Sequence, residues 1–308
     1  MDMDWTQIES GAYWSVFVAA FLGVAIWETY RPRGHLIVPA ARRWKNHSVI
    51  LLLSNIISVA LLRGSPVVLA ASLAGGGFGL LKSPELPLAA RWIAALLLLD
   101  FVRYATHRAF HAVPFLWRVH QVHHSDPDFD VSTGLRFHPL EVLITHGSYL
   151  VAIVVLAPPA GAVLLSELLS TFQNLFEHAN VSLPGPFQRW AGTVFFTPDT
   201  HRIHHSEEVS EQNRNFGQVF TCWDRLLHSY LGEPAAGKAA GKANGRANGR
   251  DGLVVGLRGY QNSRSLDIRF MLLQPFISPE QSPKQSPEQS EERSPASAAH
   301  QHFDPASR

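Results

Sequence analysis

Long apolar runs fill the first 180 residues of this 308-residue chain and leave few folds open to it. The first run, residues 12–30, carries a single charge, Glu28, and is long enough to cross a bilayer core of about 30 Å. Further runs cover residues 48–73, 89–106 and 139–177. Backbone groups in lipid need partners within their own segment, so such runs form helices. The sequence predicts an all-α, multi-pass membrane helical bundle.

Two of these runs contain breaks. Pro158 and Pro159 divide residues 139–177 into two arms of suitable length for a helical hairpin that enters the membrane and returns. Arg63 and Gly64 interrupt residues 48–73, where the helix either stops near Leu62 or bends.

The charges between the runs predict an orientation. Residues 31–47 hold five basic side chains and no acid, and the positive-inside rule places this loop in the cytoplasm and the N-terminus outside. No Lys or Arg precedes Arg31, which argues against a cleavable signal peptide, so the first run is expected to remain as a membrane helix.

Composition excludes some classes of protein. A net charge of +1 argues against a nucleic-acid binder, which would show a basic patch. The single cysteine, Cys222, excludes an internal disulfide framework and a cysteine-rich zinc or iron–sulfur site. Free cysteines are usually buried, and we expect Cys222 to be a small buried hydrophobic residue.

The chain divides into four predicted regions. Residues 1–231 form the membrane-embedded catalytic domain. Residues 232–252 repeat Ala, Gly, Lys, Asn and Arg and are typical of a low-complexity flexible linker. Residues 253–277 have apolar spacing and are expected to dock on the catalytic domain. Residues 278–308 repeat Ser-Pro with Gln and Glu, which is the composition of a disordered tail.

Histidine is concentrated in one part of the chain. Eleven of the sixteen histidines lie between His107 and His205, and most of them form one HxxxH and two HxxHH clusters. The clustered residues are His107, His111, His120, His123, His124, His201, His204 and His205. Residues at i, i+3 and i+4 share a helix face, so eight imidazoles could surround two metal ions. Imidazole suits Zn, Cu, Fe and Ni, so the ligand type leaves the metal open.

Two single histidines could add to these ligands. His138 and His178 flank the predicted hairpin at its two cytoplasmic ends, where the clusters also converge. The sequence therefore predicts a cytoplasmic, histidine-rich helical cap that holds a dinuclear metal site. His146 lies about two turns deeper and is expected to make an interior or polar contact.

Ligating histidines usually pass their second N–H to a carboxylate or carbonyl oxygen. Asp100 lies seven residues before His107 on the same helix face, and an acid at membrane depth needs a partner. The other candidates near the histidines are Asp126, Asp130, Glu177, Asn180 and Asp199. No catalytic residue beyond the metal ligands is predicted.

Several ordered segments together resemble a known family. They are residues 100–111, 120–125, 133–141, 177–180, 201–206, 215–217 and 223–226. Three histidine boxes combined with Arg136-Phe-His-Pro139 resemble the fatty acid hydroxylase/sterol desaturase superfamily of integral membrane di-iron enzymes. The likeness runs from about Trp44 to Leu231, with a weaker likeness at 252–276. Where the family often has Phe-Gly-Thr-Tyr, this chain has Leu227-His-Ser-Tyr230, which leaves the subfamily open.

The resemblance implies two iron ions, O₂ as co-substrate, and hydroxylation or desaturation of a C–H bond in a membrane lipid. A sterol, hopanoid, fatty acyl chain, carotenoid or ether lipid would fit an apolar slot. No CxxCH and no dinucleotide fingerprint is present, so we expect an external electron donor, namely a separate reductase. The predicted location is a bacterial inner membrane.

Two other functions remain as alternatives. A zinc-dependent membrane hydrolase would also use histidines, but the chain has no HExxH motif to supply a general base. A metal transporter or sensor would place its ligands near the bilayer midplane, whereas these clusters are predicted at the membrane rim.

Overall fold

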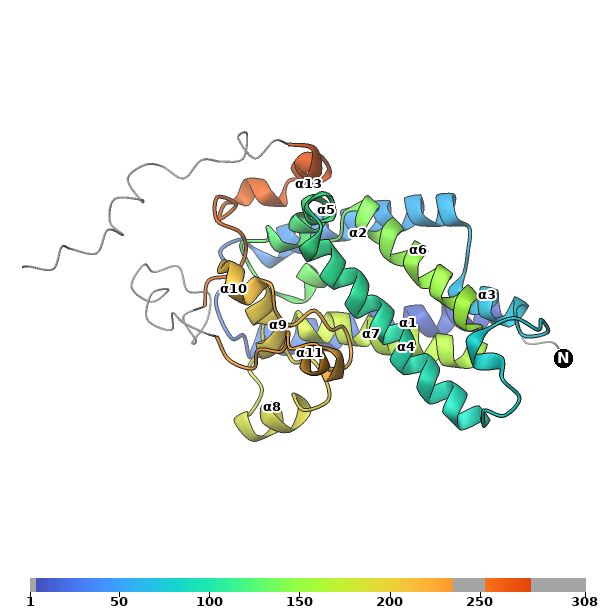
Figure 1. Cartoon of the computed structure of the whole chain (residues 1–308). Helices are drawn as coiled ribbons and strands as arrows, with labels where there is room; N and C mark the ends of the chain where they lie inside the picture. The colour runs from blue at the N-terminus through green and yellow to red at the C-terminus, as the bar shows by residue number, and fades with distance from the viewer. Residues whose placement is uncertain (1–3, 235–252, 278–308) are drawn as a thin grey trace, which may run out of the picture.

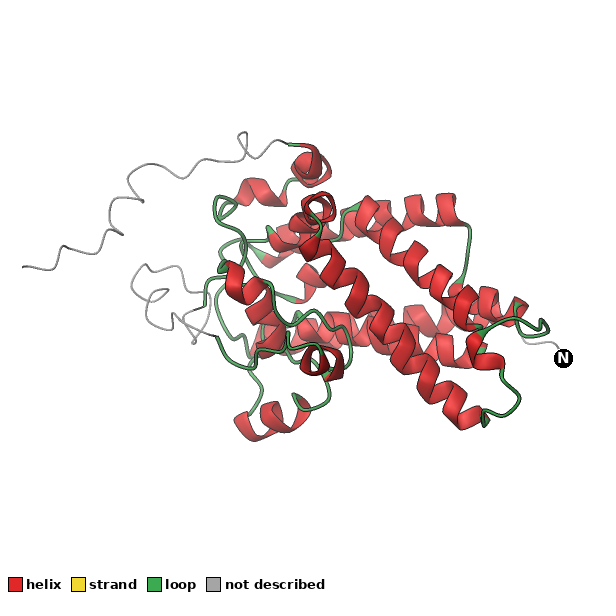
Figure 2. Ribbon diagram, viewed as in Figure 1, coloured by secondary structure: helices red, strands yellow, loops and turns green. Residues whose placement is uncertain are grey.

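The computed structural model describes residues 4–234 and 253–277, and these form helices joined by loops (Figures 1 and 2). The described residues contain no extended strand; two isolated bridges join Phe195 to Phe220 and Ser206 to Val255. The predicted all-α class is confirmed.

Five long helices form the bundle: α1 (Trp5–Tyr30), α2 (Ala40–Leu62), α4 (Leu88–Ala112), α6 (Pro139–Leu156) and α7 (Ala160–Glu177). α1 packs against α7, α2 packs against α6, and α4 packs against both α6 and α7. Figure 1 shows that these helices run along the length of the molecule, away from the N-terminal end.

Three segments are long and apolar enough to cross a membrane: Trp5–Tyr30, Ala40–Ser72 and Pro139–Leu156. They confirm a multi-pass membrane protein. Two of the expected spans, in α4 and α7, are not among these candidates. α4 carries Arg91, Asp100 and Arg103, and it packs against both α6 and α7.

The helix breaks follow from local chemistry. α2 stops at Leu62 because Arg63 adopts a left-handed conformation (φ 46°), and α3 (Pro66–Ser72) then begins behind its N-cap Ser65. α6 ends at Ala157 (φ 43°), directly before the two prolines. The two arms on either side of this turn do not form a closed hairpin, since α6 packs mainly against α2 and α7 mainly against α1.

Short helices form a cap at the end of the bundle farthest from the N-terminus (Figure 1). They are α5 (Pro114–His124), η2 (Val131–Leu135), α8 (Gly185–Ala191), α9 (Pro198–His204), α10 (Val209–Gln212), α11 (Cys222–Leu226), η3 (Ser263–Leu266), α13 (Ile268–Leu273) and η4 (Gln274–Phe276). A further short element, η1 (Leu80–Lys82), precedes α4. Cys222 is exposed at the start of α11, so its predicted burial is wrong.

A buried ionic network fixes the cap to the bundle. The Arg43 guanidinium on α2 donates to the carboxylates of Asp126 and Asp130, which lie in the loop between α5 and η2. Burial alone would raise the pKa of Asp126, but the charge of Arg43 holds it below its ordinary value. Arg136 donates to the carbonyls of Val122 and Ser265 and so joins α5 to the C-terminal segment.

Residues 253–277 lie against the cap. The Gly256 N–H donates to the carbonyl of His205 at 2.9 Å, and the Ser125 hydroxyl donates to Gln274 Oε1 at 3.0 Å. Most of the predicted linker (235–252) and the whole predicted tail (278–308) lie outside the described residues.

Candidate metal centre

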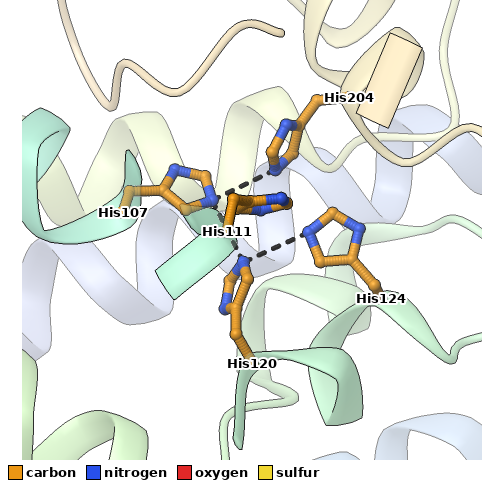
Figure 3. A group of neighbouring side chains, drawn as sticks. All are labelled: His107, His111, His120, His124 and His204. Atoms are coloured by element: carbon orange, nitrogen blue, oxygen red, sulfur yellow. Dashed lines mark hydrogen bonds between the residues drawn. The ribbon is translucent and has the colours of Figure 1, made fainter. Parts of the chain in front are cut away.

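Nine histidines meet in two groups, and within each group the possible ligand atoms lie within 4.8 Å of one another. The first group is His107, His111, His120, His124 and His204, drawn in Figure 3. The second group is His123, His178, His201 and His205. The structure thus brings together all eight clustered histidines and His178.

The two HxxHH clusters are shared between the groups in a crossed manner. On α5, His120 and His124 are four residues apart and face the first group, while His123 faces the second. On α9 and its C-cap the assignment reverses: His201 and His205 face the second group, and His204 faces the first. Each of these two short helices therefore supplies ligand atoms to both groups, which holds the groups side by side.

Hydrogen bonds fix the tautomers of three rings in the first group. A carbonyl oxygen can only accept, so His107 donates its Nδ1–H to Phe216 O (2.8 Å) and His204 donates its Nδ1–H to Arg214 O (2.7 Å). His120 Nδ1 lies 2.6 Å from Glu141 Oε1. Each ring, once neutral, keeps a lone pair on Nε2.

These lone pairs face one another. His107 Nε2 lies 3.1 Å from the Nε2 atoms of both His120 and His204 (Figure 3). Because His107 and His204 both carry their proton on Nδ1, the contact between their Nε2 atoms cannot be a hydrogen bond. The same holds for His107 and His120 when an ionised Glu141 accepts the Nδ1–H of His120. Two imidazole nitrogens bound to one metal at about 2.1 Å, at angles of roughly 90–109°, would lie about 3.0–3.4 Å apart. The spacing and the tautomers therefore both fit a shared cation.

The second group has the same spacing and fewer fixed tautomers. His178 donates its Nδ1–H to Asn174 O at 2.6 Å, and its Nε2 lies 3.3 Å from His123 Nε2 and 3.1 Å from His201 Nε2. Among the described residues, the buried Nδ1 atoms of His123 and His201 have no hydrogen-bond partner. The nearest acid, Glu177, has an oxygen 3.8 Å from His201 Nε2, which is too long for a hydrogen bond.

Burial keeps the rings neutral. It lowers the pKa of His178 from its ordinary value to about 4. Burial, with repulsion from neighbouring imidazoles, also lowers the pKa of His120, His123, His124, His201, His204 and His205. Neutral imidazole is the form that binds metals, so the groups are poised as ligands at neutral pH.

Two carboxylates lie closer to the rings than the sequence suggested. Glu141 was not predicted, although it stands in the first turn of α6, three residues after His138. That position places it at the cap end of the bundle, where its side chain is buried against His120. Glu177 was among the candidates and approaches His201.

His138 does not belong to either group, which corrects its prediction as a ligand. Its Nδ1 accepts from the Leu140 N–H at 3.1 Å, so it caps α6. Its Nε2 lies 3.3 Å from Leu272 O, which requires the proton on that nitrogen. Both nitrogens are used, and no lone pair remains for a metal.

The polar residues predicted to hold the histidines act elsewhere. Asp100 accepts from the N–H groups of Val219 and Phe220 and so anchors the loop whose Phe216 carbonyl accepts from His107. Its effect on that ring is indirect.

Asp199 and Asn180 fix the chain that follows α1. Asp199 pairs with Arg33, and the Asn180 side chain exchanges hydrogen bonds with the Gly34 backbone. The described contacts of both side chains are with that segment and not with a ligating ring. Asp126 and Asp130 likewise belong to the Arg43 network.

A cavity of about 280 Å³ begins at the histidines and continues between the helices of the bundle. His107, His120, His123, His178 and His201 lie at one end. Its walls come from α1, α2, α4, α6 and α7. The predicted polar contact of His146 is present on this wall, where its Nε2–H donates to Gly64 O at 3.0 Å. A group bound in this cavity could therefore contact members of both histidine groups.

Comparison with known proteins identifies a family that part of the chain resembles. Residues 92–229 match the fatty acid hydroxylase family. Ornithine lipid hydroxylase OlsE of Rhizobium tropici is 32% identical over 149 residues, which are 48% of this chain and 44% of the relative. Alkylglycerol monooxygenase of Caenorhabditis elegans is 31% identical over 145 residues, 46% and 27% of the two chains. Sphinganine C4-monooxygenase 2 of Arabidopsis thaliana is 32% identical over 151 residues, 47% and 55%.

The matched region spans only about a quarter to just over half of the length of these relatives. No solved structure shows a significant match to the chain. The family match covers all nine histidines of the two groups as well as Glu141 and Glu177. Residues 92–229 are therefore similar to the fatty acid hydroxylase family, and this part of the chain contains both histidine groups.

Proposed function

We propose that this protein is an O₂-dependent di-iron enzyme that hydroxylates a C–H bond of a membrane lipid. One observation carries the proposal: two adjoining groups of buried, neutral imidazoles stand at the end of a cavity that continues between membrane helices. The relatives named above are called hydroxylases and monooxygenases, which favours hydroxylation over desaturation.

The nine grouped histidines would hold the two ions, five on the first and four on the second. Bound iron would supply the O₂-activating chemistry that an unactivated C–H bond requires. An all-imidazole set suits this role because it contains no thiolate that oxygen could oxidise.

The chain's own residues would prepare this site. Glu141 and the carbonyls of Phe216, Arg214 and Asn174 would each hold a ring proton on Nδ1 and so direct Nε2 toward the ion. The buried walls would exclude bulk water, and the cavity would place one carbon of the lipid beside the histidines.

Orientation follows from the loop after α1. Asp128 accepts from the N–H groups of Ile37 and Val38, so this loop lies at the cap end of the bundle. The basic residues of this part of the chain would face the cytoplasm, and the histidine groups with them. We propose a bacterial inner-membrane protein whose N-terminus is outside, supplied with electrons by a separate reductase. Residues 1–231 and 253–277 would form the oxygenase unit.

Metal content and oxygen use test this function. The full chain, purified in nanodiscs, should hold two irons and consume O₂ with a reductase and lipid extract, placing ¹⁸O from ¹⁸O₂ in the product. Two zinc ions with turnover under strict anaerobiosis would instead identify a hydrolase. Metal flux into proteoliposomes without lipid oxidation would identify a transporter.

A further inference from the structure

The cavity has a polar end that the metal chemistry does not use. Arg103 on α4, Tyr149 on α6 and Glu167 on α7 line it together with the histidines. At 1.5 Å per residue, Arg103 stands about 6 Å along α4 from His107, and Tyr149 about 12 Å along α6 from Glu141. This end therefore lies deeper between the helices than the histidine groups.

Arg103 is held in place by neutral side chains and does not hydrogen-bond to Glu167. Its Nη1 donates to Ser166 Oγ at 3.0 Å, and its guanidinium carbon lies 4.0 Å from the centre of the Tyr149 ring. Its Nη2 lies 3.9 Å from Glu167 Oε1, which is beyond hydrogen-bond length. The two side chains keep 13% and 20% of their surface accessible although they lie inside the bundle. The cavity, which both residues line, is where a further group could reach them.

The charges at this end balance. Glu167 also hydrogen-bonds to Glu9, whose carboxylate in turn accepts from Ser65. Two carboxyl groups share a hydrogen bond only if one of them carries a proton. The guanidinium and the pair of acids together are then close to neutral, and they offer both donors and an acceptor to the cavity.

We infer that Arg103 and Glu167 form a polar subsite that holds a hydroxyl or amide group of the lipid, and so set which carbon lies beside the histidine groups. The inference rests on the proposed function and names its substrate class. A hydroxyl or amide both accepts and donates, so it can bridge the guanidinium and the carboxylate. A carboxylate would meet Glu167, an amine would meet Arg103, and a plain hydrocarbon would leave both without a partner.

Apolar side chains also line the cavity and could contact a hydrocarbon chain. The side chains of Val102, Phe110, Leu135, Val142 and Leu175 line the same cavity. Since Arg103 and Glu167 lie deeper between the helices than the histidines in the same cavity, a group held by them would define the distance to the oxidised carbon.

Binding in the absence of oxygen tests the subsite without turnover. The metal-loaded full chain in nanodiscs is titrated anaerobically with palmityl alcohol, N-methyl palmitamide, hexadecane, palmitate and palmitylamine, by displacement of a fluorescent lipid. We expect the alcohol and the amide to bind about 10- to 100-fold more tightly than hexadecane. Arg103→Met should remove this preference. Arg91→Met is the matched control, because Arg91 lies on the same helix, is not among the residues lining the cavity, and in the described part of the chain donates to the carbonyls of Leu86 and Ser83.

Glu167→Gln gives a gain that misfolding cannot mimic. Palmitate should bind more tightly than to the wild type, because the negative charge that remains then lies on Glu9, which is not among the residues lining the cavity. Equal binding of hexadecane and the alcohol to the wild type, or an unchanged preference in both cavity variants, would overturn the inference. If those results accompany lipid oxidation, only the subsite fails. If the preference is present and no lipid is oxidised, the proposed function fails and the subsite stands.

Discussion

The two histidine groups lie side by side, but the protein holds them differently. In the first group, three of the five rings pass a proton to a carbonyl or carboxylate oxygen. In the second group, to which α5 and α9 also contribute, only His178 of the four rings does so among the described residues. The acid nearest the second group, Glu177, stays 3.8 Å away from His201.

This difference indicates which group is preorganised before a metal ion binds. Rings with a fixed tautomer and orientation lose little freedom when an ion binds, whereas loosely held rings must be ordered by the ion itself. The first group should therefore bind its metal more tightly. The second should bind more weakly and adjust more easily.

The largest effect should come from removing a ligand. His204→Ala in the first group and His123→Ala in the second should each lower turnover at least about 100-fold. Loss of a ligand should cost more than loss of a residue that only hydrogen-bonds to a ligand, which costs about 10- to 100-fold. Lipid oxidation and membrane insertion are measured on the same preparations. His138→Ala is the control; it should keep its metal, because that ring caps α6. Wild-type rates in either ligand variant would contradict the assignment.

Loss of a supporting carboxylate should separate the groups. Glu141→Gln should weaken metal binding at the first group about 10- to 100-fold, because His120 loses a charged acceptor at 2.6 Å. Glu177→Gln should have a smaller effect, because its oxygen makes no hydrogen bond to His201. Metal titrations of both variants provide the comparison. An equal loss in the two variants would mean that the groups are held alike.

Chelation should empty the groups in order. Half the metal should leave at a chelator concentration about tenfold below that needed for the rest, and the second group should be the one emptied first. Spectra of the half-loaded protein identify the remaining ion. Glu141→Gln should bring the two steps together. A single step in the wild type would show that the difference in hydrogen bonding has no consequence for affinity.

A weaker, indirect effect is expected from Asp100→Asn. Asp100 holds the loop that carries the Phe216 carbonyl, so first-group affinity should fall only a few-fold, with stability lower by about 1–3 kcal/mol. Asp199→Asn is the matched control, since Asp199 pairs with Arg33. A change in the metal affinity of the second group alone would argue against an effect of Asp100 through the Phe216 loop.

Removal of the tail should have the smallest effect. Truncation after Ile277 should leave both groups filled and activity near the wild-type level, because residues 278–308 have the composition of a segment without a core. Iron content and lipid oxidation are compared with those of the full chain. A truncated protein without iron would show that the tail contributes to the site.

Much of the fold and the histidine groups could be predicted from local pattern. Spacings of three and four residues place imidazoles on one helix face, and apolar runs identify membrane helices. The same patterns did not show that α6 and α7 are separated by α3 and α4, because local sequence patterns do not report which distant segments pack together.

The polar partners were harder to predict because they are chosen by tertiary contact. Glu141 is 21 residues from His120, and only the fold brings the two together. Asn180 and Asp199 are close to histidines in sequence but bind the chain after α1. His138 was misassigned because an N-cap uses the same lone pair as a metal ligand.

The most direct test of the account is the iron content of the purified wild-type chain, measured together with Mössbauer spectra of each iron environment. The account predicts two irons per chain in two distinct environments, one of which is lost first on chelation. At most one iron per chain, or a full complement of zinc with activity independent of O₂, would contradict it.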